Sequence, residues 1–182
     1  ILAGSRALEG DPCENWTRHN AFLKDRCGRL NSMGLTRLEY KSANGTDFSV
    51  GLIPQALFLG GEEPNHVNGA VYNPNIPSEE VFVTPRAGDA EGLVVATRPL
   101  SYRGQMIEDF WFRFEGGRVA EYGASRNEAL LGTMLCMDEG AARLGECALV
   151  PYDSPIRNGG VMFYNTLFDE NAACHLALGD GY

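Results

Sequence analysis

Several features that define other protein classes are missing from this sequence. No apolar run reaches the roughly 20 residues of a transmembrane helix, so we expect no membrane span. Lysine and arginine number 15 against 24 acidic residues, and the net charge of −9 argues against the basic stripe that binds nucleic acid. The first residues, ILAGSRALEGDP, lack the apolar core of a signal peptide. We therefore expect a cytoplasmic protein with no nucleic-acid or membrane partner.

The cysteines do not form a recognisable framework either. Their number is odd, their spacings are wide and no C-x-x-C pair occurs among Cys13, Cys27, Cys136, Cys147 and Cys174. A zinc ribbon or a disulfide scaffold would need closer or paired spacings. We expect free thiols in a reducing compartment.

The sequence motifs of many enzymes are absent as well. There is no P-loop, no dinucleotide-binding glycine motif, no G-x-S-x-G and no H-E-x-x-H. Cys174 adjoins His175, but neighbours on the helix expected here point about 100° apart and make a poor nucleophile–base pair. A hydrolase with a Cys174 or serine nucleophile remains an alternative, to be recognised by resistance to chelators and loss of activity on thiol alkylation.

The composition indicates a packed domain. Hydrophobic residues make up 44% and charged residues 21% of the 182 residues, which is typical of a globular core. The first residue is Ile rather than Met, and we expect a segment of a longer chain. We interpret residues 1–10 as a tail or linker and residues 11–182 as one domain segment.

Local patterns predict mixed secondary structure. Asp11-Pro12 starts an amphipathic helix that ends at Gly34. Asn44-Gly45 and Gly116-Gly117 mark two β-hairpins, and Ser125 to Glu128 form a capping box for a second helix. ECALVP and VMFYNT read as strands, and Asp169 caps a short helix that carries His175. The sequence predicts an α+β fold with a mostly antiparallel, curved sheet and about three packed helices.

Three residues have the chemistry of metal ligands. Glu80 lies in PSEEVF, Glu146 in LGECALVP and His175 in ENAACHLALG. Carboxylates and imidazoles bind zinc, manganese and cobalt, and a pair of such ions activates water for amide hydrolysis. From the residues alone, solvated acids and a core histidine explain the same pattern. A shared site requires the three side chains to converge within a few ångströms.

Longer stretches carry a resemblance. DPCENW, NPNIPSEEVFVTP, RPLSYRGQMIEDFWFRF and LGECALVPYDSPIRNGGVMFYNTLFDENAACHLALG resemble the aminopeptidase T / aminopeptidase S family of two-metal metallo-aminopeptidases. The resemblance extends from Asp11 to Tyr182. It implies a hydrolase that releases N-terminal amino acids from peptides with a free N-terminus. It also implies a homodimer and two divalent ions, which are zinc, cobalt, manganese or magnesium.

The resemblance assigns site residues one at a time. It implies that Glu80, Glu146 and His175 are metal ligands. It also implies that Tyr182 is catalytic and donates a hydrogen bond to the developing oxyanion.

The printed sequence departs from this family in two respects. The family completes its site with an H-x-D pair after the tyrosine and carries an N-terminal α/β domain, and neither is found here. His19 and His66 are followed two positions later by Ala21 and Asn68, so neither supplies the pair. We expect these 182 residues alone to be inactive or impaired. The alternative is a metal-free module that serves only dimerisation or structure.

Overall fold

The computed structural model describes residues 1–181, which divide into two compact units. The first unit comprises Ile1–Gly34, Leu57–Phe82 and Ala148–His175. The second comprises Leu35–Ala56, Val83–Cys147 and the residues from Leu176 on. The chain therefore passes between the units several times, and each unit is built from segments far apart in sequence.

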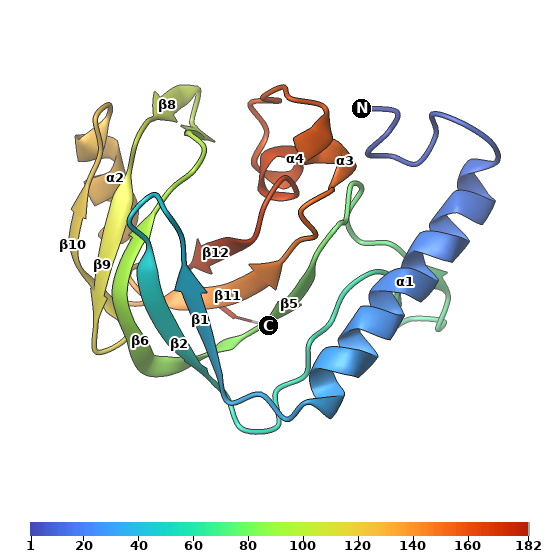
Figure 1. Ribbon diagram of the computed structural model, residues 1–182, viewed down its shortest axis with the longest axis horizontal. Helices are drawn as coiled ribbons and strands as arrows, with labels where there is room; N and C mark the ends of the chain where they lie inside the picture. The colour runs from blue at the N-terminus through green and yellow to red at the C-terminus, as the bar shows by residue number, and fades with distance from the viewer. Residues whose placement is uncertain (182) are drawn as a thin grey trace. The chain divides into compact units, whose positions relative to one another are not determined.

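Helix α1 (Pro12–Ser32) is the longest element of the first unit (Figure 1). The Asp11 carboxylate accepts hydrogen bonds from the backbone N–H groups of Cys13 and Glu14, and Gly34 follows the helix with φ +59°. Both predicted ends are thus confirmed. The buried face differs from a purely apolar stripe, because it contains two polar side chains, His19 and Asn20, beside Leu23 and Cys27.

The remainder of the first unit is short elements and loops. Strands β3 (Glu63–Pro64) and β4 (Val71–Tyr72) pair antiparallel. Helices α3 (Pro155–Asn158) and α4 (Thr166–Glu170) are capped by Ser154 and Asn165. The prediction of a strand at VMFYNT is wrong. Residues 161–165 are irregular because the Asp169 carboxylate binds the N–H groups of Phe163 and Asn165 and folds them onto α4.

The second unit is built on an antiparallel sheet with strand order β1-β2-β6-β9-β10 (Figure 1). Its strands are β1 (Arg37–Lys41), β2 (Asp47–Leu52), β6 (Pro85–Val95), β9 (Trp111–Glu115) and β10 (Arg118–Gly123). A further pair consists of β7 (Leu100–Tyr102) and β8 (Gln105–Ile107). Both predicted hairpins are confirmed, at Asn44-Gly45 and Gly116-Gly117. Phe48 and Phe114 are buried in its core with ring centroids 5.2 Å apart.

Helix α2 (Glu128–Leu135) begins later than predicted. Its N-cap is Asn127, in a left-handed conformation and without a side-chain cap hydrogen bond. The expected capping box fails because the preceding polar side chains bind β8 and its flank. The Ser125 hydroxyl donates to the carbonyl of Glu108, and the Asn127 amide donates to that of Met106.

Strands β5 (Val81–Val83), β11 (Leu144–Leu149) and β12 (His175–Leu178) form a three-stranded sheet in the order β12-β11-β5. His175 therefore begins a strand, and the helix predicted to carry it is wrong. That helix was expected to start at Asp169, whereas α4 already ends at Glu170. Four helices and mainly antiparallel strands in the described residues confirm the predicted α+β class. None of these helices has the length and apolarity to cross a bilayer.

Candidate metal centre

Three potential ligands converge in the first unit. One ligand atom from each of Glu80, Glu170 and His175 lies within 4.8 Å of the other two. Oε2 of Glu80 and Nε2 of His175 are 2.8 Å apart. Two of the three predicted ligands are thus brought together, and Glu170 joins them.

Each of these side chains stands at the end of a regular element. Glu80 immediately precedes β5, whose Val81 and Val83 are fully buried and anchor the backbone. Glu170 is the last residue of α4, and His175 is the first of β12. The backbone of each residue is therefore held by the neighbouring helix or strand, which suits a cluster of ligands.

The ring of His175 is oriented by its own backbone. Nδ1 lies 3.1 Å from the carbonyl oxygen of Ala173, so an Nδ1–H donor there leaves Nε2 to face Glu80. A hydrogen bond from one ring nitrogen to a carbonyl is the usual way of fixing a metal-binding imidazole. The side chains of His175 and Glu80 are only 16% and 8% exposed. Two carboxylates and one imidazole in this geometry fit a zinc, manganese or cobalt ion.

The remaining predicted site residues lie elsewhere. Glu146 is half-buried on β11 in the second unit, and its role as a ligand stays a prediction. Tyr182 lies outside the described residues. Glu170 is not among the predicted ligands. The acidic pair Asp169-Glu170 could have indicated it. The predicted helix began at this pair, whereas α4 ends there.

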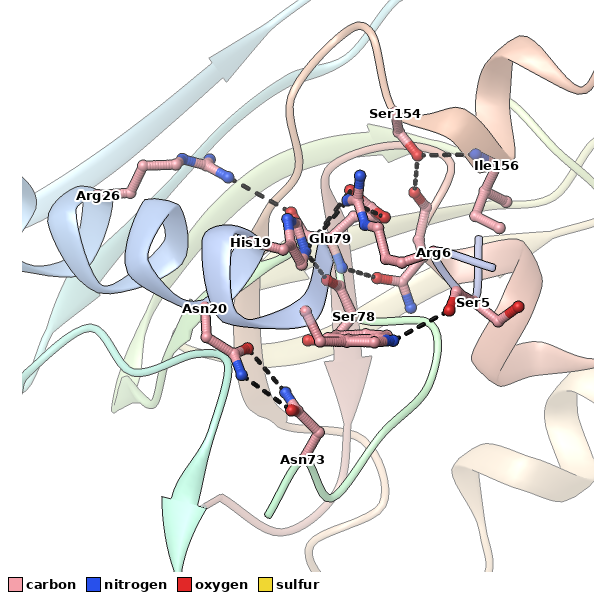
Figure 2. Close-up of polar contacts among 12 residues, drawn as sticks. Ser5, Arg6, His19, Asn20, Arg26, Asn73, Ser78, Glu79, Ser154 and Ile156 are labelled. Carbon is pink, nitrogen blue, oxygen red and sulfur yellow. Dashed lines mark hydrogen bonds and ion pairs between the residues drawn. The ribbon is translucent and has the colours of Figure 1, made fainter. Parts of the chain in front are cut away.

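A buried ion pair adjoins the centre. The Glu79 side chain is 3% exposed, and Nη2 of Arg6 lies 2.6 Å from both of its carboxylate oxygens (Figure 2). Burial nevertheless raises the pKa of Glu79 to about 7, although Arg6 and Arg26 both lower it. Desolvation therefore outweighs the attraction of the guanidinium.

His19 lies beside this ion pair and stays neutral at pH 7. Burial lowers its pKa to about 4, with Arg6 and Arg26 adding to the effect and the Ser78 carbonyl opposing it. Its Nε2 is 2.6 Å from that carbonyl oxygen, which assigns the single ring proton to Nε2 (Figure 2). His19 thus acts as a hydrogen-bond donor and not as a free ligand.

A cavity in the first unit belongs to this network and not to the ligand cluster. It has a volume of about 620 Å³, and its lining includes Arg6, His19 and Glu79. Glu80, Glu170 and His175 do not line it. Proximity of ligand atoms, and not the presence of a cavity, therefore identifies the candidate metal centre.

Cys174 has no geometry for nucleophilic catalysis with its neighbour. Its Sγ lies 3.4 Å from the backbone nitrogen of Val150 and 3.6 Å from the carbonyl oxygen of that residue. His175 starts a strand, along which successive side chains point to opposite faces. The thiol is thus directed to a backbone partner.

Comparisons with known proteins identify the family of this chain. The family model described as thermophilic metalloprotease (M29) matches residues 1–182. Aminopeptidase T of Thermus aquaticus is 45% identical and aminopeptidase AmpS of Bacillus subtilis 41% identical over all 182 residues. The structure of wild-type AmpT from Thermus thermophilus superposes with a TM-score of 0.88 at 44% identity, covering 94% of this chain and 43% of that one. The chain spans 44% of the length of both curated relatives.

Proposed function

Because the chain belongs to the thermophilic metalloprotease (M29) family, we propose that it carries metal-ligand residues of an aminopeptidase, which releases N-terminal amino acids from peptides. The observation that carries the proposal is the convergence of Glu80, Glu170 and His175 within 4.8 Å. Relatives at 41–45% identity are named aminopeptidases, which supports the reaction class.

The ligand set follows from the cluster and the resemblance together. Glu80 and His175 bind directly, and Glu170 supplies a further carboxylate from α4. Glu146 is proposed as a ligand from the resemblance alone. Two divalent ions, drawn from zinc, cobalt, manganese and magnesium, are the proposed cofactors. When bound, they supply Lewis-acid polarisation and a water of lowered pKa for attack on the amide.

The protein residues have separate tasks in this scheme. The Ala173 carbonyl keeps the His175 proton on Nδ1, so that Nε2 offers its lone pair. One of the glutamates accepts the proton of the attacking water. Tyr182 donates a hydrogen bond to the oxyanion of the tetrahedral intermediate. The net charge of −9 favours substrates with a protonated α-amino group.

Assembly and location are further parts of the proposal. We propose a homodimer that acts on peptides in the cytoplasm, as the family resemblance implies. The alternative function is a metal-free module that serves only dimerisation or structure. The two are separated by whether a divalent ion binds at the cluster.

Metal binding by the 182-residue polypeptide is expected to be weak. Its sequence contains no H-x-D pair, so the ligand shell is reduced, and a deficient shell lowers affinity. Calorimetric titration with Zn²⁺ or Co²⁺ should therefore give low affinity and fewer than two ions per chain. Tight binding of two ions per chain would contradict this expectation.

Any hydrolysis should depend on added cation and on a free α-amino group. We expect low turnover of an unmodified peptide by the 182-residue polypeptide, raised by Co²⁺ and removed by a chelator. The same peptide with an acetylated N-terminus is the matched control and should not be cleaved. Turnover that resists the chelator but disappears on thiol alkylation would instead indicate a cysteine hydrolase.

A further inference from the structure

A single peptide unit just before Glu80 is held from both of its sides. The carbonyl of Ser78 and the N–H of Glu79 belong to the same trans peptide, in which these two groups point in opposite directions. Nε2 of His19 donates to the carbonyl at 2.6 Å. Oδ1 of Asn171 accepts from the N–H at 2.7 Å. The plane of this peptide is therefore fixed by two side chains from different elements.

Both of these side chains are themselves buried and anchored. His19 is 8% exposed on α1, and Asn171 is 0% exposed at the end of α4. The side-chain amide of Asn171 donates to the carbonyl of Leu167 at 2.8 Å. The backbone carbonyl of Asn171 accepts from the Ser154 hydroxyl at 2.6 Å. Buried side chains in a hydrogen-bonded network of this kind hold a defined geometry.

The next peptide unit is held as well. Nη1 of Arg26 donates to the carbonyl of Glu79 at 3.3 Å (Figure 2). Nη2 of the same residue donates to the carbonyl of Leu149 at 3.2 Å. Backbone on both sides of Glu79 is thus tied to α1. Only the side-chain torsions of Glu80 are left to aim its carboxylate at His175.

The Asn171 contact also joins two ligand candidates. Asn171 directly follows Glu170, and Glu79 directly precedes Glu80. The hydrogen bond between Asn171 and Glu79 therefore sets the distance between the two backbones that carry these carboxylates. A ligand pair on separate elements needs such a connection to keep its spacing within the tolerance of a metal ion.

We propose that His19 and Asn171 are positioning residues that clamp the Ser78–Glu79 peptide and so hold the Glu80 carboxylate on the metal-facing side of His175. This inference rests on the proposed function, because its expected consequence is a change in metal affinity. The clamp itself is a property of the metal-free chain.

The test compares two polar substitutions at one position. In His19→Gln the amide nitrogen occupies the position of Nε2 and keeps the donor to Ser78, whereas in His19→Asn the amide is too short to reach. We expect His19→Asn to weaken Co²⁺ binding by about 10–100-fold, as for the loss of an outer-sphere partner. His19→Gln should stay within about 3-fold of the wild-type affinity on the same scale. Leu23→Ala, a buried apolar change on α1, controls for loss of helix stability.

A second readout needs no metal. With His19 replaced, the only histidine rings left are exposed His66 and His175, so the ¹⁵N resonances of His175 are identified directly. We expect His19→Asn to shift the His175 Nε2 resonance and His19→Gln and Leu23→Ala to preserve it. Asn171→Ala removes the other hydrogen bond of the clamp, at the end of α4, and should shift the same resonance. This variant keeps the test decisive if His19→Asn does not fold.

The outcomes are distinguishable. Equal behaviour of His19→Asn and His19→Gln, or a His175 resonance that stays at its wild-type position in both His19→Asn and Asn171→Ala, would overturn the clamp. Failure of every variant and of the wild type to bind Co²⁺ would overturn the proposed function, while the His175 resonance still decides the clamp.

Discussion

Glu80→Gln is expected to lower the affinity for Zn²⁺ or Co²⁺ by at least about 100-fold, since loss of an outer-sphere partner alone costs about 10–100-fold. The amide has the shape of the carboxylate but is neutral, and it is a much weaker ligand for these ions. The substitution also removes the charge that lies 2.8 Å from Nε2 of His175. Calorimetric titration, at raised protein concentration where binding is weak, measures the loss.

Matched substitutions locate the effect. Glu63→Gln changes an exposed carboxylate that accepts a hydrogen bond from Tyr72, and metal affinity should not respond. Glu170→Gln should lower the affinity like Glu80→Gln if Glu170 is a direct ligand. Wild-type affinity in Glu80→Gln would remove the cluster as the metal site.

Local sequence rules were sufficient where structure is set by neighbours in the chain. Asp11 and Gly34 delimit α1, and the two hairpin turns lie between the expected strands, because caps and tight turns depend on a few adjacent residues. The same rules were ambiguous at His175. Apolar residues at 172, 176 and 178 fit a short helix or a short strand, and pairing in the β12-β11-β5 sheet decides between them.

The buried polar residues were beyond the reach of local rules. His19 binds Ser78, 59 positions away, and Asn20 binds Asn73, 53 positions away. The periodicity of apolar residues in α1 carries no information about such distant partners. The resemblance identified Glu80 and His175 correctly as neighbours in space. The resemblance did not name Glu170, which lies beside them at the end of α4.

The buried Arg6–Glu79 ion pair should be a sensitive point for stability. Arg6→Met leaves the Glu79 carboxylate buried without its cation. We expect the free energy of unfolding to fall by about 3 kcal/mol at pH 8, the lower end for a buried pair that loses one partner. The lower end applies because Arg6 is itself 25% exposed. Urea denaturation measures the change, and Arg18→Met, at an exposed arginine on α1, is the control.

The loss should depend on pH in a defined direction. The pKa of Glu79 is about 7 in the folded chain against 4.5 without burial, so its protonated form contributes stability that is lost as pH rises through 7. The positive charge of Arg6 lowers the pKa of Glu79, so removing Arg6 raises this pKa further. The folded variant then holds its proton to higher pH, and the stability difference from wild type should widen between pH 5 and pH 8.

A double substitution separates charge burial from packing. Arg6→Met/Glu79→Met replaces both partners by apolar side chains of similar length, and such replacements of buried ion pairs are often neutral or stabilising. We expect it to recover most of the stability lost in Arg6→Met and to show little dependence on pH in this range. A double variant as unstable as Arg6→Met would mean that the N-terminal segment is held by the shape of Arg6 and not by its charge.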